Sequence, residues 1–600
     1  MPKETNNHLI VMPLMRSNAN ESYILPLGIL YISSAMKKAG LNVETLNLNH
    51  HTNPMATLQK TIIKKKIDVV LSGGMSPQYS EIKQIFNIAK KTNNKIISIC
   101  GGGIIAGDPI PAMLALEVDY GVIGEGEETT VELCQYINAA KNFTEVNGII
   151  FKNKNDFEIT KSRRAIKKID EIPWPDYDGF NFKEFLEVSN IGTNGLNCNR
   201  AGMIITSRSC PFACTFCFHT SGRTYRQRSM DEVFKEIDLL TSKYNVGFLY
   251  ISDELFSQSI DRVDEFCRRI KAYNIPWNAS FRVDGINDQV LQLLKNANCA
   301  SIGIGVKSAD PSVLKSMNKR VTIEQIENAL EKIHSAQIPV VGNFIFGDIA
   351  ETSQTANNTI EWWKKNQRYG LFMKMIKVYP GTGLYKYALK NNIIKNPVTF
   401  LKEGCPPINV SKMSNKEMGE LVTKITLLPL QENAKIHNAT LLSINNGKCD
   451  LQGNCQYCNQ KNTWQSVSLF SLNYVTCHNC KEKLATTVPK SIINSIDTHL
   501  DKLIANGNKI ALWGMADYSM EFLTTSNSVK NNEDIYLIDL STDKQLMHIN
   551  NKKVYAPSVI NQKNIDTIIV LVPVFYSTIK SNIESSYPNI KIISIIDLFN

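Results

Sequence analysis

The stretch AGMIITSRSCPFACTFC, residues 201–217, decides the organisation of this chain. It begins with an apolar run typical of a buried strand and ends in three cysteines, Cys210, Cys214 and Cys217. Three thiolates at this spacing can hold one iron–sulfur cubane and leave its fourth iron open to another ligand. The alternative is a structural metal site that lacks one ligand. The position of the cysteines directly after a strand favours the open cluster.

Residues 201–395 repeat one unit, a strand-like segment followed by an amphipathic helix-like segment. The expected strands are AGMIITS, VGFLYIS, PWNASFR, ASIGIGV, VVGNFIF and MKMIKVY. Six such units predict a six-stranded partial TIM barrel, with its chemistry on the loops that follow the strands. The three cysteines lie on the first of these loops.

Residues 1–145 also alternate strands and helices and predict a doubly wound α/β domain. Glycine-rich turns follow its strands, and ligands of such sheets bind at the carboxyl ends of the strands. The candidate binding residues there are Ser72, Gly73, Gly101, Gly102, Gly103, Glu125, Gly126 and Glu127. Residues 146–200 are aperiodic and rich in proline and aspartate, so we expect a linker.

The last third of the chain predicts three further parts. Residues 396–448 read as a helical extension, and residues 486–600 as a Rossmann-like α/β domain. Between them, residues 449–485 carry two C-x2-C pairs, formed by Cys455, Cys458, Cys477 and Cys480. Paired C-x2-C turns favour a zinc-ribbon-like module over the alternative, an auxiliary iron–sulfur cluster. Cys449 is close enough in sequence to compete as a ligand.

The pattern C-x3-C-x-aromatic-C, with Phe216 as the aromatic residue, resembles the cluster loop of the radical S-adenosylmethionine (SAM) family. The resemblance implies a 4Fe–4S cluster whose open iron binds SAM, and a 5′-deoxyadenosyl radical formed by cleavage of that cofactor. It further implies SAM contacts from Phe216, Asp253, Glu254, Arg282 and Ser308. Lys307 departs from the family pattern, because the cobalamin-binding subgroup usually has a glutamate there.

The N-terminal domain resembles the cobalamin-binding domain that precedes such barrels. The matching segments are LPLGILYISSAMKKAG, LSGG, GGG and GVIGEGEET. The Asp-x-His-x-x-Gly motif, which supplies a histidine to cobalt in many cobalamin proteins, is absent. The resemblance therefore implies cobalamin with no histidine on its lower face.

These features together predict a cobalamin-dependent radical SAM enzyme that methylates an unactivated centre of a small molecule, with a sugar-linked molecule as one candidate. The alternatives are a radical rearrangement or ring closure without methyl transfer, an RNA-modifying radical SAM enzyme, and a non-catalytic cobalamin or cluster sensor. The chemistry needs an external one-electron reductant. The net charge of +10 is modest for 600 residues, so a nucleic-acid partner is not expected. No apolar run is long enough to span a membrane, and we expect a cytoplasmic protein.

Overall fold

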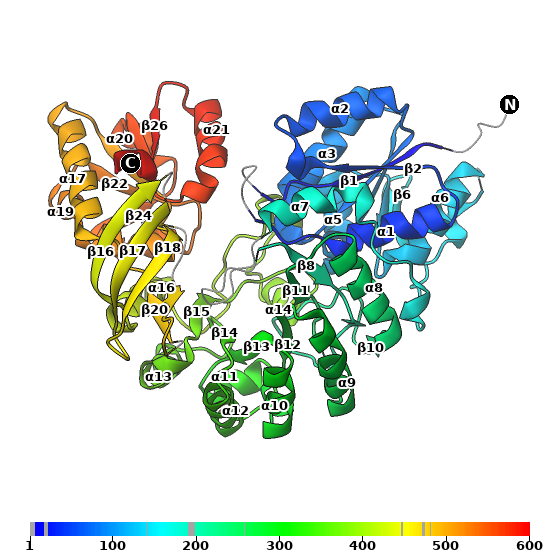
Figure 1. Cartoon of the computed structure of the whole chain (residues 1–600). Helices are drawn as coiled ribbons and strands as arrows, with labels where there is room; N and C mark the ends of the chain where they lie inside the picture. The colour runs from blue at the N-terminus through cyan, green and yellow to red at the C-terminus, as the bar shows by residue number, and fades with distance from the viewer. Residues whose placement is uncertain are drawn as a thin grey trace.

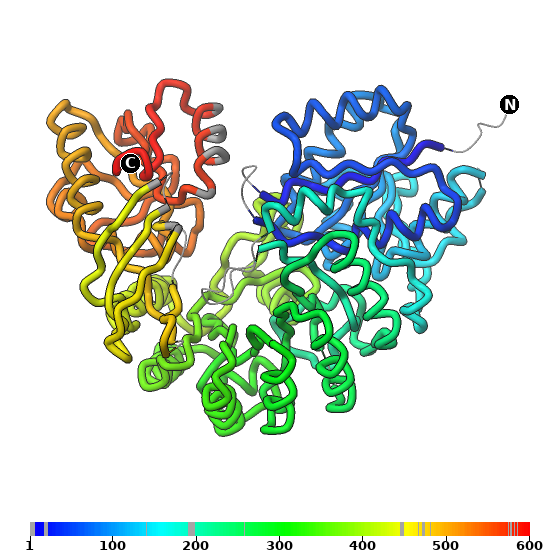
Figure 2. Tube along the Cα trace, viewed as in Figure 1, coloured from blue at the N-terminus to red at the C-terminus, as the bar shows by residue number. Residues whose placement is uncertain are grey.

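The computed structural model describes residues 6–16, 22–139, 141–189, 199–256, 258–445, 448–470, 474–480 and 482–599. Figures 1 and 2 show three bodies: an N-terminal α/β domain, a central curved sheet lined by helices, and a C-terminal α/β domain. The two outer domains lie at opposite ends of the central sheet (Figure 1).

The N-terminal domain is a seven-stranded sheet in the order β2-β1-β3-β4-β5-β6-β7. Strands β1 to β5 pair in parallel, whereas β6 and β7 add in antiparallel fashion. The bounds are β1 His8–Met12, α1 Leu27–Lys38, β2 Val43–Asn47, α2 Pro54–Lys64, β3 Val69–Gly73, α3 Tyr79–Thr92, β4 Ile97–Gly101, α4 Gly103–Gly107, α5 Pro109–Leu116, β5 Tyr120–Val122, α6 Gly126–Asn138, β6 Ile149–Asn153 and β7 Asp156–Ile159.

The segment expected to be a linker, residues 146–200, is structured where it is described. Its first part forms β6 and β7, and Ile149 and Ile150 are fully buried in the sheet. Its second part contains α7 (Phe182–Val188) and packs on the barrel, where the Tyr177 hydroxyl donates to Glu236 at 2.7 Å. Buried aromatic residues therefore make this segment part of two cores, although its proline and aspartate content predicts a linker.

The central sheet is the expected partial barrel. Its six strands lie in the order β15-β14-β13-β12-β11-β8, and all pair in parallel. The bounds are β8 Ala201–Ile204, α8 Met230–Ser242, β11 Phe248–Ile251, α9 Ile260–Ile270, β12 Trp277–Phe281, α10 Asp288–Asn296, β13 Cys299–Lys307, α11 Pro311–Ser316, α12 Ile323–Ser335, β14 Val340–Phe346, α13 Ser353–Lys365, β15 Phe372–Met375 and α14 Gly383–Lys390. A short hairpin, β9 Ser207–Arg208 with β10 Arg226–Gln227, frames the cysteine loop. The prediction of an α/β chain with a partial barrel is confirmed.

Two small sheets connect the barrel to the C-terminal domain. The helices α15 (Pro397–Lys402) and α16 (Asn415–Glu432) agree with the expected helical extension, but residues 436–445 form a strand. This strand pairs in antiparallel fashion with β17 (Lys448–Cys455), the segment that follows it in the chain, and the two strands supply each other's backbone hydrogen bonds. The strands are β16 Ile436–Asn445, β17 Lys448–Cys455, β18 Lys461–Ser468, β19 Tyr474–Thr476 and β20 Lys483–Ala485.

The C-terminal domain is a six-stranded sheet in the order β23-β24-β22-β21-β25-β26. All its pairings are parallel except that of β23 with β24. The bounds are α17 Lys490–Ala505, β21 Ile510–Trp513, α18 Met520–Thr525, α19 Asn527–Asn531, β22 Ile535–Ile538, β23 His548–Ile549, β24 Lys552–Tyr555, α20 Val559–Lys563, β25 Thr567–Val570, α21 Tyr576–Ser586 and β26 Lys591–Ser594.

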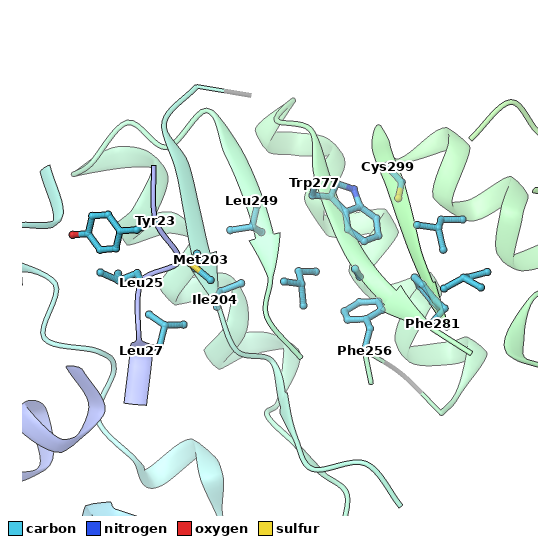
Figure 3. Close-up of a cluster of buried hydrophobic side chains, with 14 of the residues drawn as sticks. Tyr23, Leu25, Leu27, Met203, Ile204, Leu249, Phe256, Trp277, Phe281 and Cys299 are labelled. Carbon is cyan, nitrogen blue, oxygen red and sulfur yellow. The ribbon is translucent and has the colours of Figure 1, made fainter. Parts of the chain in front are cut away.

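One hydrophobic core runs from the N-terminal domain into the barrel. Figure 3 shows Tyr23, Leu25 and Leu27 beside Met203 and Ile204 of β8, with the core continuing across the barrel strands. Burial of this much apolar surface stabilises the contact between the two bodies and so holds the cavity between them. Among the described residues, no helix has the length and apolar character needed to cross a membrane.

Candidate active site

The three cysteines of the 201–217 stretch lie on the loop between β9 and β10, after the first barrel strand. Backbone bonds hold this loop from two sides: the Thr215 N–H donates to Met317 O at 3.1 Å, and the Leu384 N–H donates to Thr215 O at 3.0 Å. The side-chain amide of Asn318 donates to Ala213 O at 2.9 Å. The shape of the loop thus depends on residues that are far away in the sequence.

The thiols lie in positively charged surroundings. A hydrogen bond from Cys217, helped by the charges of Lys319 and Arg282, lowers the pKa of Cys214 to about 6 against the effect of burial. The same bond raises the pKa of Cys217, and burial raises that of Cys210. Nearby cations favour thiolates, which are the form that binds iron.

Two buried polar atoms of the loop, Thr215 Oγ1 and His219 Nε2, have no hydrogen-bond partner among the described residues. Buried polar groups are almost always hydrogen-bonded, so these atoms indicate that a further group belongs here. The thiols and these unpaired atoms fit a cluster with a polar cofactor beside it.

The two neighbouring acids after β11 have different surroundings. Asp253 is buried and accepts from Thr206 N–H at 2.7 Å, from Thr206 Oγ1 at 2.5 Å and from Ser207 Oγ at 2.9 Å. Burial raises its pKa to about 6. Glu254 is 36% exposed and accepts from His219 Nδ1 at 3.0 Å. Of the two, only Glu254 presents its carboxylate toward a cavity, whereas Asp253 fixes the end of β8.

Arg282 and Ser308 have partners within the chain. The Arg282 guanidinium lies 3.6 Å from the centre of the Phe212 ring and pairs with Asp284 at 2.9 Å. Ser308 is buried; its Oγ lies 3.2 Å from Thr359 Oγ1 and accepts from the Asp310 N–H. Arg282 therefore packs against the cysteine loop through Phe212, and Ser308 stabilises the turn after β13.

Lys307 is the residue that departs from the family pattern. It follows an irregularity in the pairing of β13 with β14 and has a positive φ of 75°. Its Nζ donates to Asn343 Oδ1 at 2.8 Å and lies 5.9 Å from the centre of the Phe216 ring. Burial, with repulsion from Lys319, lowers the pKa of Lys307 to about 8. Lys307 thus supplies positive charge beside the predicted SAM contact Phe216.

A cavity of about 520 Å³ separates the N-terminal domain from the barrel. All eight candidate residues predicted at the strand ends line it: Ser72, Gly73, Gly101, Gly102, Gly103, Glu125, Gly126 and Glu127. The barrel contributes Ser209, Thr220 and Ser221 from the cysteine loop, together with Glu254. Its described lining includes no histidine.

The glycines at the cavity also allow the strand ends to approach closely. A Cβ on Gly73 would lie 2.5 Å from Gly101 O, and one on Gly102 would lie 2.7 Å from Gly74 O. A Cβ on Gly103 would meet Phe218 of the cysteine loop at 3.0 Å. Glycine is therefore required here by backbone packing as well as by access to the cavity.

Two acids at the rim join the domains through ion pairs that the sequence does not reveal. Glu125 pairs with Arg208 at 3.0 Å and with Arg226 at 2.7 Å, while Glu127 pairs with Arg208 at 2.5 Å. Burial opposes ionisation of Glu125, but the bonds and charges of the two arginines hold its pKa below the usual value. The arginines cross from the β9–β10 hairpin to the N-terminal domain, so these pairs set the orientation of the cavity walls.

The four cysteines of the second group lie close together. The Sγ atoms of Cys455 and Cys480 are 3.6 Å apart, as are those of Cys458 and Cys477, and all four lie within 4.8 Å of one another. Among the described residues, no other group of three or more His, Cys, Asp or Glu side chains brings its ligand atoms this close together. Cys449 is buried on β17 and lies outside the group.

Comparisons with known proteins find matches to both the N-terminal domain and the barrel. The radical SAM superfamily model matches residues 204–362, and the B12 binding domain model matches residues 19–134. An uncharacterized methyltransferase of Pyrococcus horikoshii is 27% identical over 62% of this chain and 79% of its own length. The anaerobic magnesium-protoporphyrin IX monomethyl ester cyclase of Rubrivivax gelatinosus is 26% identical over 56% of this chain and 61% of its own length.

The fold is similar to that of a radical SAM methyltransferase, TsrM from Kitasatospora setae, solved with cobalamin and a 4Fe–4S cluster bound. The TM-score is 0.54 at 16% identity, over 64% of this chain and 76% of that chain. The two family matches support a 4Fe–4S cluster, SAM and cobalamin as the cofactors. The chain therefore contains a radical SAM domain, matched over residues 204–362, with a B12 binding domain, matched over residues 19–134, in front of it.

Proposed function

We propose that this chain is a cobalamin-dependent radical SAM methyltransferase that acts on an unactivated centre of a small molecule. The observation that carries the proposal is the composition of one cavity, which joins the glycine-rich strand ends to the loop that bears Cys210, Cys214 and Cys217. A cobalamin in this cavity would lie beside the cluster loop. When bound, the cluster supplies the electron that cleaves SAM, and cobalamin carries the methyl group.

The residues of the chain have separate tasks in this proposal. Cys210, Cys214 and Cys217 would hold the cluster, and Phe216 would lie against SAM. Glu254 has an accessible carboxylate for the amino group of SAM, and Arg282 positions the loop through Phe212. None of the residues in the described lining of the cavity would supply an imidazole ligand to a bound cobalamin.

The test is to reconstitute the chain anaerobically with iron, sulfide and cobalamin, reduce it, add SAM and measure two products. We expect 5′-deoxyadenosine, from radical cleavage, and S-adenosylhomocysteine, from methyl transfer to cobalamin. An intact cluster that yields neither product would overturn the proposal.

A radical ring closure without methyl transfer is the second candidate, because the similarity to the Rubrivivax cyclase favours it. In this case the same assay would yield 5′-deoxyadenosine with no S-adenosylhomocysteine. The two candidates therefore differ in one measured product.

For Cys455, Cys458, Cys477 and Cys480 we propose a structural zinc ion. A tetrahedral site with Zn–S bonds of about 2.3 Å places sulfur atoms about 3.8 Å apart. The observed distances of 3.6 Å support this geometry, whereas a cubane needs room for four irons between its ligands. Metal analysis that finds zinc in the absence of the 4Fe–4S cluster would test the assignment.

We propose that the C-terminal sheet, with the strand order β23-β24-β22-β21-β25-β26, is Rossmann-like and that this domain covers the barrel rather than binding a nucleotide in the usual way. Asp539 stands at the ribose position of such folds. Its two oxygens already accept from the N–H groups of Met515, at 2.7 Å, and Ser541, at 2.8 Å. These bonds support a role for Asp539 in shaping the loops after β21 and β22.

A further inference from the structure

A second cavity, of about 530 Å³, lies between the barrel and the C-terminal domain. On the barrel side it is lined by Phe216, Lys307, Ile345 and residues 373–377 and 379. On the other side it is lined by Asp517, Ser541, Asp543 and Lys544, and residues of α16 close it. This cavity is distinct from the first, since the two share no lining residue.

The position of this second cavity is typical of a ligand site in both folds that border it. Lys374, Met375 and Ile376 stand at the carboxyl end of β15, and Asp517 and Ser541 follow β21 and β22. Ligands of barrels and of doubly wound sheets bind at the carboxyl ends of strands. Here two such ends face the same space, and the ion pair between Lys374 and Asp517 joins them.

The charges at the second cavity do not balance. Its lining contains four lysines, Lys307, Lys374, Lys377 and Lys544, against the two acids Asp517 and Asp543. Asp517 is shared between two lysines, at 2.5 Å from Lys374 and 3.8 Å from Lys544.

Two of these lysines are well placed to bind an anion. Lys544 is mostly buried, with a side chain that is 22% exposed. Lys377 is exposed and forms no ion pair with another described residue. Asp543 also lies close enough to interact with both lysines, but the four lysines of the lining still outnumber its two acids, so an anionic ligand would balance the remaining positive charge.

Apolar side chains line much of the remaining wall of the second cavity, which leads toward the cluster loop, and Lys307 lies beside Phe216 at that end. Ile345, Met373 and Met375 of the barrel, with Val422 and Ile425 of α16, form this part. Phe216, between Cys214 and Cys217, closes the barrel end. A ligand whose anionic group lies at Lys377 and Lys544 would thus extend an apolar part toward the candidate radical site.

We propose that the second cavity is the substrate site, and that it binds an organic anion, with Lys377 and Lys544 holding its phosphate or carboxylate group. This inference rests on the proposed function, since it names the substrate class of that reaction. The C-terminal domain then takes part in substrate recognition.

The experiment uses the reconstituted full chain with two probes, inorganic pyrophosphate and malonate, titrated by calorimetry at low salt. We expect one of them to bind, and the probe that binds shows whether the group is phosphate or carboxylate. Lys377→Met should weaken binding about tenfold, and Lys377→Met with Lys544→Met should abolish it, whereas Lys544→Arg should retain it. Binding should also weaken as salt is raised.

The matched controls are Lys365→Met on α13 and Lys502→Met on α17, which remove an exposed lysine from each domain away from the cavity. Circular dichroism and cobalamin absorbance check that each variant is folded. Binding of neither probe, equal loss in a control, or displacement of the probe by SAM would overturn the inference. Release of 5′-deoxyadenosine and S-adenosylhomocysteine by the wild-type chain is measured separately, so failure of the substrate site is distinguishable from failure of the proposed function.

Discussion

Two groups of cysteines with similar spacing have different environments in this molecule. The first, Cys210, Cys214 and Cys217, lies near two lysines and an arginine, with unpaired polar atoms around it and cavities on both sides. The second, Cys455, Cys458, Cys477 and Cys480, brings four Sγ atoms within 4.8 Å.

Nearby residues also form the hydrogen bonds that hold the second group in place. The Cys455 N–H donates to Gln460 O and the Cys477 N–H to Glu482 O, and the Asn462 amide donates to Cys477 Sγ at 3.6 Å. A closed set of four ligands suits a structural metal, whereas three ligands on a loop that lines two cavities leave room for chemistry. The difference teaches that the surroundings of a cysteine group, more than its spacing, separate a catalytic site from a structural one.

The largest expected effect comes from Cys214→Ala. It removes one of three cluster ligands, so we expect iron to fall from about four per chain to background and 5′-deoxyadenosine to disappear. Cys267→Ala, at a buried cysteine of α9, is the control and should keep both. Full cleavage of SAM by Cys214→Ala would contradict the assignment of the first group as the catalytic one.

The next effect is expected from Cys477→Ser. Loss of one ligand should release the zinc and lower the free energy of unfolding by about 3 kcal/mol or more, because structural zinc couples binding to folding. The iron content should not change. Metal analysis measures the zinc and iron content, and thermal unfolding measures the loss of stability. Cys449→Ala is the control, which should keep its zinc. Iron in place of zinc at this group would support an auxiliary cluster instead.

Glu125→Gln tests whether the first cysteine group depends on the neighbouring domain. The change leaves Arg226 and Arg208 without their shared buried partner, and breaking such a pair is strongly unfavourable. We expect cobalamin to bind about a hundredfold more weakly in an absorbance titration. Glu128→Gln, whose side chain is 56% exposed, should change the affinity little. Equal affinities in the two variants would contradict this role.

The smallest effect is expected from Asp253→Asn, and it is a change in stability that depends on pH. Burial raises the pKa of Asp253 from 3.8 to about 6, so its contribution to stability is full below about pH 4 and is lost as pH rises through 6. Asparagine stays neutral throughout. The stability of the wild type relative to Asp253→Asn should therefore fall by about 2 kcal/mol between pH 4 and pH 7.5. Urea unfolding of the metal-free chain across this range measures the difference, and a flat difference would contradict it.

Local patterns predicted the elements well. The six barrel strands and the alternation of the N-terminal domain followed from periodicity, and the position of the cysteines followed from the end of β8. Periodicity failed at residues 149–159 and 436–445, which form strands: β6 joins the edge of the N-terminal sheet at β5 and also pairs with its neighbour β7, and β16 pairs with its neighbour β17. Strand pairing depends on the available sheet edge, and a segment does not encode that edge locally.

The site was predicted less completely than the fold. The strand-end glycines line the expected cavity, yet Asp253 and Arg282, expected as SAM contacts, bond to Thr206, Ser207 and Asp284 in the chain. His219, Arg208 and Arg226 belong to the site but carry no motif. The arginines of the β9–β10 hairpin, beside the cysteine loop, are the signal that could have pointed to a domain contact.

The sequence by itself determined the chemistry available to this protein, because three cysteines after a strand and glycines at strand ends are local features. The tertiary structure decided what these residues face. Glu125 meets Arg226 across 101 positions of the chain, and Lys374 meets Asp517 across 143. Charge pairing and burial act through space, so the walls of both cavities exist only once the domains are packed on the barrel.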